Sequence, residues 1–218
     1  MRAFGIIALT VVVSLLTSTA QAGFQYGFWA ITNNSNANKA TGTNQLKLEA
    51  FDVGNNQVQL LFSNTGSKAS SITDIYFDDG QNLLTSVASI QNSAGVIFRT
   101  GNNLPTLTGG GNIGFFTDQT LNTESTTTAY GVNPGESVGL IFQIASGRMF
   151  GEVVNSLQNC NLRVGIMMQG FAGSALTESF VNASTNSSPV PVTPEPSALA
   201  LGGLACVGLL WQKRKKRA

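Results

Sequence analysis

The chain has 218 residues, of which only 11% are charged, and its formal net charge at pH 7 is +1. It contains no histidine, which excludes Ser-His-Asp and Cys-His triads, histidine-based zinc or copper sites and the usual pH switch near neutrality. Six of the twelve basic residues are Arg2 and those at 213–217, so the chain between them carries six basic against eleven acidic side chains, a net charge of −5. No basic face is left to neutralise phosphates, and no nucleic acid is expected as a partner.

The N-terminus has the parts of a secretory signal peptide. Arg2 precedes an apolar run over residues 4–16, and small polar residues follow as far as Ala20-Gln21-Ala22. Because Ala20 and Ala22 have the A-x-A spacing that signal peptidase requires, we predict a signal peptide over residues 1–22, cleaved after Ala22. The alternative is an N-terminal membrane anchor. It is disfavoured because the apolar run has about 13 residues, against roughly 20 needed to span the hydrocarbon core.

Residues 23–181 are predicted to form one folded ectodomain built mainly of strands. They are rich in Gly, Asn, Ser and Thr and poor in charge, which suits short strands joined by turns better than a helical bundle. Two runs with a period of two flank Gly54-Asn55-Asn56 and predict a β-hairpin. The predicted strands are residues 24–31, 45–53, 57–62, 72–79, 83–90, 95–99, 137–144, 162–171 and 176–181.

Two segments of the ectodomain depart from this pattern. Residues 33–44 are rich in Asn and are predicted to form a loop. Apolar residues at 150, 153, 154 and 157 follow the i, i+3, i+4, i+7 spacing, which predicts a short amphipathic helix over residues 148–158. No period of 20–50 residues recurs, which disfavours a solenoid or propeller. The expected fold class is therefore all-β, an antiparallel β-sandwich with one short amphipathic helix.

A linker and an apolar segment follow the ectodomain. Residues 182–193 are rich in Ser and Pro, and the prolines favour extended backbone. The tail, residues 194–218, begins with Pro194-Glu195-Pro196 and continues with an apolar run over 198–211, predicted as a single transmembrane helix. Such a helix is about 21 Å long, short of the roughly 30 Å hydrocarbon core, so it would be a marginal anchor.

A basic cluster ends the chain and predicts a cytoplasmic stop-transfer signal by the positive-inside rule. The cluster consists of Lys213, Arg214, Lys215, Lys216 and Arg217. Together with the signal peptide, it places the ectodomain on the far side of the inner membrane.

The string TPEPSALALGGLACVGLLWQKRKKR is similar to the PEP-CTERM sorting signal of Gram-negative bacteria. The Pro-Glu-Pro at 194–196, the Gly-containing helix and the basic end occur in the family's order, over about 30 residues of tail. The resemblance implies that the protein is the substrate of an exosortase. This inner-membrane enzyme, similar to a cysteine transpeptidase, cuts near the Pro-Glu-Pro and releases the protein or transfers it to the cell surface. The alternative is an ordinary single-pass tail anchor.

Parts of the ectodomain carry a second resemblance. IYFDDG, NPGESVGLIF, LRVGIMMQGF and ESFVN resemble pieces of an uncharacterised ectodomain often found ahead of such sorting tails. This resemblance implies a β-sandwich and no activity.

The best acidic cluster is Asp74, Asp78 and Asp79, near the end of the predicted strand 72–79. Carboxylates are hard oxygen ligands that suit Ca²⁺, but Asp78-Asp79-Gly80 and its neighbours supply only a fragment of a calcium-binding loop. The competing interpretation is a strand that ends in a solvated Asp-Gly turn. We therefore predict no metal site, and keep these three residues as a weak Ca²⁺ candidate.

A paired-carboxylate glycosidase is the enzymatic alternative. Asp78 and Asp79 cannot form the pair themselves, since adjacent strand residues point to opposite faces. One of them would have to face another carboxylate at a separation of roughly 5 to 10 Å. The possible partners are Glu124, Glu136, Glu152 and Glu178. Because no spacing selects one, no catalytic residue is assigned and the protein is predicted not to be an enzyme.

Other residues have a structural and a functional interpretation. Trp29, Tyr26, Tyr76 and Tyr130 could form a sugar-stacking platform, but we predict that they are core residues. The glycines at 109–111 lack the Lys-Ser/Thr of a phosphate loop and are predicted to form a flexible turn. Cys160 is predicted to be a small buried side chain, unpaired with Cys206 of the apolar tail.

The expected function is that of an exported bacterial cell-surface or extracellular-matrix protein, structural or adhesive. Its predicted partners are the Sec translocon, signal peptidase, the inner membrane as a transient anchor, the exosortase and exopolysaccharide. No cofactor is expected. The alternative is a carbohydrate-binding or carbohydrate-cleaving surface module.

Overall fold

The computed structural model describes residues 23–101, 105–123, 128–183 and 191–192, which belong to one compact unit bounded by Gln21 and Thr193. The predicted signal peptide with Ala20 and Ala22 lies outside the described residues. So do Pro194-Glu195-Pro196, the predicted helix at 198–211 with Cys206, and the basic cluster at 213–217. Among the residues that are described, no helix is long and apolar enough to cross a membrane.

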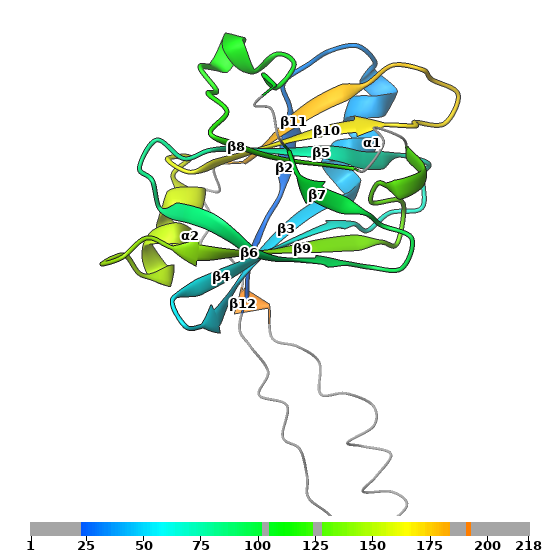
Figure 1. Cartoon of the computed structure of the whole chain (residues 1–218). Coiled ribbons are helices and arrows are strands. Elements are labelled where there is room, and N and C mark those ends of the chain that lie inside the picture. The colour runs from blue at the N-terminus through cyan, green and yellow to red at the C-terminus, as the bar shows by residue number, and fades with distance from the viewer. Residues whose placement is uncertain (1–22, 102–104, 124–127, 184–190, 193–218) are drawn as a thin grey trace, which may run out of the picture. The chain divides into compact units, whose positions relative to one another are not determined.

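Two antiparallel sheets form the described unit and lie on one another as two layers (Figure 1). The first sheet has the order β12-β1-β3-β4-β9-β6, and the second has the order β2-β11-β10-β5-β8-β7. The first sheet contains β1 (Gly23–Tyr26), β3 (Leu46–Gly54), β4 (Gln57–Asn64), β6 (Leu84–Asn92), β9 (Ser137–Ile144) and β12 (Pro191–Val192). The second contains β2 (Phe28–Ala30), β5 (Ser71–Asp78), β7 (Phe98–Thr100), β8 (Gln119–Thr123), β10 (Arg163–Gln169) and β11 (Glu178–Asn182).

The main core lies between the two sheets. Along β4 every second residue is buried, as the predicted period of two requires. Phe77 of the second sheet contacts two rings of the first sheet in edge-to-face geometry, with ring centroids 6.3 Å from Phe62 and 4.9 Å from Phe142. Such pairs contribute about 0.5–1.5 kcal/mol each beyond the area that they bury. The expectation of a β-rich fold with two packed antiparallel sheets is confirmed.

The predicted hairpin is present as β3 and β4. Its turn residues Asn55 and Asn56 both have positive φ, 52° and 56°. Asn tolerates the left-handed region better than most residues, and a two-residue turn with two positive φ values matches the twist of the paired strands.

The predicted strand at 24–31 is divided at Gly27. β1 pairs with β3 in the first sheet, whereas β2 pairs with β11 in the second. Tyr26 and Phe28 on either side of Gly27 are both buried in the core. The imperfect alternation in this segment therefore reflects a change of sheet.

The prediction of a loop at 33–44 is wrong, because Asn36–Gln45 forms helix α1. The described part of the ectodomain therefore has two α-helices where one was expected. Ser35 is its N-cap and accepts a hydrogen bond from the backbone N–H of Asn38. Tertiary contacts hold this polar helix: Asn38 donates to Ser174 Oγ at 3.1 Å, and Gly42 lies against the ring of Phe180. A Cβ at Gly42 would lie 2.1 Å from Cζ of that ring.

The predicted amphipathic helix is confirmed as α2 (Phe150–Gln158). Val153 and Leu157 on its apolar stripe are fully buried. Tyr26 donates to the carbonyl of Val154 at 3.1 Å, and Asn182 donates to the carbonyl of Leu157 at 3.1 Å, so α2 is tied to strands of both sheets.

Strand β8 and the segment before it were not predicted. Gly110 and Gly111 begin a 3₁₀ helix (Gly110–Ile113), and Gly109 is the residue before it, so this segment is not the flexible turn that was predicted. Leu107 and Phe115 on either side of it pack with Tyr76 and Val181 in a second, smaller apolar cluster. A Cβ at Gly165 would lie 2.5 Å from Cδ2 of Leu107, so the close packing of this segment depends on a glycine in β10. A second 3₁₀ helix spans Thr128–Tyr130.

Candidate functional site

The three carboxylates of the weak Ca²⁺ candidate are all buried, with 3%, 7% and 6% of Asp74, Asp78 and Asp79 exposed. The interpretation as a solvated turn is therefore wrong. Asp74 accepts hydrogen bonds from Thr73 Oγ1 at 2.8 Å and from Asn122 Nδ2 at 2.6 Å. No group of three or more acidic, histidine or cysteine side chains in the described part of the chain is arranged to hold a metal ion.

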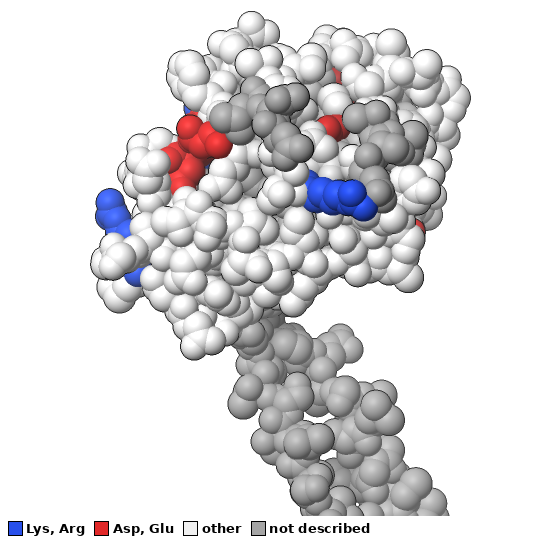
Figure 2. All heavy atoms as spheres, in the orientation of Figure 1, with Lys and Arg blue, Asp and Glu red and all other residues white. Residues whose placement is uncertain are grey.

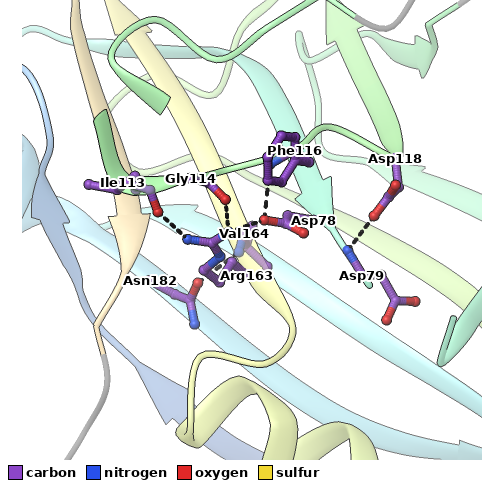
Figure 3. A network of polar contacts seen from close by, with 9 residues as sticks. All are labelled: Asp78, Asp79, Ile113, Gly114, Phe116, Asp118, Arg163, Val164 and Asn182. Atoms are coloured by element: carbon purple, nitrogen blue, oxygen red, sulfur yellow. Dashed lines mark hydrogen bonds and ion pairs between the residues drawn. The ribbon is translucent and has the colours of Figure 1, made fainter. Parts of the chain in front are cut away.

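Asp78 forms an ion pair with Arg163, which lies opposite it in the register of β5 and β10. The guanidinium also donates to the carbonyls of Ile113, at 2.9 Å, and Gly114, and it lies 5.4 Å from the ring centroid of Phe115. Figure 3 shows these contacts converging on the Arg163 side chain. The pair therefore fastens the 3₁₀ segment to the outer face of the second sheet, which is a structural role.

Asp79 has different partners from Asp78. Its backbone N–H donates to Asp118 Oδ2 at 2.6 Å, and its own Oδ2 accepts from the N–H of Leu84 at 2.7 Å. Burial raises the pKa of Asp79. The backbone N–H groups of Leu84 and Leu83 lower it, and the charges of Asp118 and Asp78 raise it further. The other oxygen of the carboxylate, Oδ1, is buried and has no hydrogen-bond partner.

A hollow of about 440 Å³ lies beside this turn. Its lining joins the β5–β6 turn, the start of β6 and the start of β8, and none of these lining residues is basic. Gln119 donates to the carbonyl of Thr85 at 3.3 Å across it. We call it the Asp79–Asp118 hollow, and it is lined by Asp79, Asn82, Leu84, Thr85, Asp118 and Gln119.

None of the three described partners proposed for a glycosidase pair lines this hollow. Glu136 accepts from the side chain and backbone of Asn133, and Glu152 pairs with Arg148 on α2. Glu178 is fully buried and accepts from Thr32 Oγ1 and the N–H of Ser35. Glu124 lies outside the described residues.

The carboxylate that sequence reasoning missed is Asp118. It was missed because β8, which begins at the next residue, was not predicted, so Asp118 had no assigned place in a sheet. The weakly apolar QTLNT sequence of β8 carried little strand signal.

The four aromatics of the predicted core fall into two classes. Tyr26 and Tyr76 are buried, and burial raises the pKa of each phenol above its usual range. Trp29 is 45% exposed on the edge strand β2, and Tyr130 is 39% exposed. The prediction of core packing is therefore confirmed for Tyr26 and Tyr76 and wrong for Trp29 and Tyr130, and a platform of all four does not form.

Cys160 is a free, half-buried thiol at a positive φ of 56°. Its Sγ lies 4.0 Å from the carbonyl oxygen of Asn182. Burial raises the pKa of the thiol, and the charge of Arg163 lowers it. The arrangement is that of a packed small side chain, as predicted, although it is not completely buried.

Charged groups are sparse on the molecular surface. Figure 2 shows a face that is mostly uncharged, with one compact group of acidic side chains and few scattered basic ones. This agrees with the charged fraction of 11% in the sequence.

No protein-family model matches the chain, and neither a curated protein nor a solved structure is significantly similar to it.

Proposed function

We propose that the protein is an exported bacterial cell-surface or extracellular-matrix protein, structural or adhesive, that an exosortase sorts and processes through its C-terminal signal. The observation that carries this proposal is the order of signals in the sequence: an A-x-A site at Ala20 and Ala22, a β-rich body, and Pro194-Glu195-Pro196 before an apolar run and a basic end. Each signal has a separate physical role, and chance is a poor explanation for all of them in this order.

The positions of the first and last described strands support the proposal. β1 begins at Gly23, directly after the predicted cleavage site, and β12 ends at Val192, two residues before Pro194. These two strands pair antiparallel, with Gly23 opposite Val192. The predicted cuts after Ala22 and near Pro194 would therefore remove no residue of the described strands.

The internal contacts of the acidic side chains favour a structural role over catalysis. Asp78, Glu152 and Glu178 are each engaged in an ion pair or in hydrogen bonds that hold loops and helices in place. The face drawn in Figure 2 is mostly uncharged, which suits contact with neutral polysaccharide or protein in a matrix better than contact with a polyanion.

The test is the fate of the tail in the native host. Mass spectrometry of surface protein should recover the body without peptides that span residues 196–211. Changing Pro194, Glu195 and Pro196 to Ala should retain the full-length chain in the inner-membrane fraction. Recovery of intact tail peptides from surface protein would contradict the proposal and favour an ordinary tail anchor.

Carbohydrate binding is the second candidate function, and the exposure of Trp29 favours it. Exposed tryptophan rings stack on sugar faces, and Trp29 lies on the edge strand β2 with 45% of its surface exposed. Specific binding on a glycan array that is abolished by Trp29→Ala and kept by Phe116→Ala, a change at another exposed aromatic, would establish this function. No specific binding by the wild-type protein would leave the purely structural role, and equal binding by both variants would show that Trp29 does not contact the sugar.

A further inference from the structure

A β-bulge in strand β5 turns the side chain of Thr73 toward that of Asp74. The pairing of β5 with β10 passes directly from Asp74 to Ile72, so Thr73 is the extra residue of the bulge. In a regular strand, adjacent side chains point to opposite faces of the sheet. Here the hydroxyl of Thr73 donates to Asp74 Oδ2 at 2.8 Å. The bulge therefore brings a hydroxyl and a carboxylate together at one point of the sheet.

The same hydroxyl contacts the amide group of a third side chain. Gln169, the last residue of β10, donates from Nε2 to Thr73 Oγ1 at 3.1 Å. Because Nε2 is bonded to the amide carbon Cδ at about 1.33 Å, Oγ1 lies no more than about 4.4 Å from that carbon. A rotation of the Gln169 side chain brings these two atoms to the separation of about 3–3.5 Å from which a nucleophile attacks.

The carboxylate of Asp74 is oriented as a base for this hydroxyl. Its second oxygen, Oδ1, accepts from Asn122 Nδ2 at 2.6 Å across the pairing of β5 with β8. A nucleophile, a base and a third group that orients the base, all within hydrogen-bond reach, form the arrangement that activates a hydroxyl for covalent chemistry. Thr73, Asp74 and Asn122 have these three places.

Burial decides which electrophile the hydroxyl of Thr73 can reach. Thr73 is fully buried and Asp74 is 3% exposed, so a dissolved substrate cannot approach the hydroxyl. Gln169 is half-buried, which leaves a route by which ammonia can depart from its amide. The exclusion of water also protects a reactive bond from hydrolysis. The geometry therefore favours a reaction of the chain with itself.

We propose that Thr73 and Gln169 form an intramolecular ester that cross-links β5 and β10. Thr73 Oγ1 forms a bond to Cδ of Gln169, and the bond between Cδ and Nε2 breaks. Asp74 takes the proton of the hydroxyl and passes it to the departing nitrogen, so one molecule of ammonia leaves and no other reactant is needed. The ester gives the second sheet a covalent link in a chain whose described cysteine, Cys160, is free. The inference does not depend on the proposed sorting by an exosortase.

The test is the intact mass of the full-length chain, purified in mild detergent, together with a peptide map. The wild-type chain should be lighter by one molecule of ammonia than the mass calculated for its two termini. The map should contain two peptides joined through residues 73 and 169. Mild alkali should separate them and leave a carboxylate at residue 169, because an ester hydrolyses more readily than an amide. A wild-type chain at the full calculated mass would overturn the proposal.

Four variants distinguish the ester from other losses of ammonia. Thr73→Ser keeps a hydroxyl and should keep the cross-link, whereas Thr73→Val should have the full calculated mass. Asp74→Asn should carry the cross-link in only a minor fraction of molecules, because a positioned base contributes about 10²–10⁴-fold to the rate. The matched control is Thr85→Val, which removes a strand hydroxyl that donates to the carbonyl of Gln143 and should leave the cross-link in place. Loss of ammonia that persists in Thr73→Val would overturn the proposal, because it would place the reaction at another amide.

Discussion

Asp78 and Asp79 are adjacent in the sequence and almost equally buried, yet their electrostatic surroundings differ. Asp78 lies opposite Arg163 across two paired strands, so its charge is neutralised directly. Asp79 begins a turn, and the charged groups that act on it are Asp118 and Asp78, both negative. The two aspartates thus differ because β5 ends between them. Asp78 is paired with a cation and holds the 3₁₀ segment, whereas Asp79 has only negative charges near it.

The largest effect is expected when the guanidinium of Arg163, the positive partner of Asp78, is removed. Arg163→Met would leave Asp78 buried without its partner and would remove hydrogen bonds to the carbonyls of Ile113 and Gly114. Breaking a fully buried pair costs about 3–5 kcal/mol. Because the Arg163 side chain is 21% exposed, we expect about 2–3 kcal/mol, measured by urea unfolding.

The double variant Asp78→Asn/Arg163→Met is the control for this prediction. It should be less destabilised than the sum of the two single variants, since it contains no unpaired charge. Additive effects would show that Arg163 acts through packing on Phe115 and not through the ion pair.

The next prediction concerns how the free energy of unfolding depends on pH through the buried carboxylate of Asp79. Burial raises the pKa of Asp79, so the folded protein holds this proton more tightly than the unfolded chain does. The stabilisation from this group is therefore fully present below its ordinary pKa of about 4 and is lost as the pH rises through the raised pKa. Asp79→Asn, which cannot ionise, should lack this loss.

The measurement is the difference in unfolding free energy between wild type and Asp79→Asn from pH 3.5 to pH 8. The difference should shift in favour of the variant as the pH rises. Asp118→Asn should reduce the shift only in part, because burial is the larger cause and the charge of Asp118 a smaller one. A difference that is constant with pH would contradict unfavourable ionisation at Asp79.

A smaller effect is expected for the reactivity of the Cys160 thiol. Burial raises the pKa of this thiol, so less thiolate is present at neutral pH than in a free cysteine. We expect alkylation by iodoacetamide at pH 7.5 to be several-fold slower in the folded protein than in urea. Equal rates would show that the thiol is not packed against the carbonyl of Asn182.

The smallest effect is expected at the exposed ion pair of α2. Arg148 and Glu152 are 2.8 Å apart in an i, i+4 pair, with 47% and 36% of their side chains exposed. Arg148→Ala should cost less than about 0.5 kcal/mol in urea unfolding, because water and salt screen such pairs. A cost similar to that of Arg163→Met would mean that burial does not explain the difference in strength between the Arg148–Glu152 and Arg163–Asp78 ion pairs.

Several elements could be predicted because their signals are local. The alternation in β4, the Asn55-Asn56 turn and the apolar stripe of α2 depend on residues a few positions apart, and all three were placed correctly. Helix α1 was missed because contacts with Ser174 and Phe180, more than 130 residues away, hold a polar sequence that has little helical signal of its own. β8 was missed for the same reason, since its partners β5 and β7 specify it more than its side chains do.

The sequence by itself determined the strand-rich character of the body and its main turns, because each depends on composition or short-range spacing. Asp79 was named from the sequence as part of an acidic cluster, but the tertiary structure decided its partner. The register of β5 with β10 places Arg163 opposite Asp78. The start of β8, which was not predicted, places Asp118 within hydrogen-bond distance of the backbone N–H of Asp79. Charges act through space, so pairing across strands 39 and 85 residues apart could not be read from neighbours in the chain.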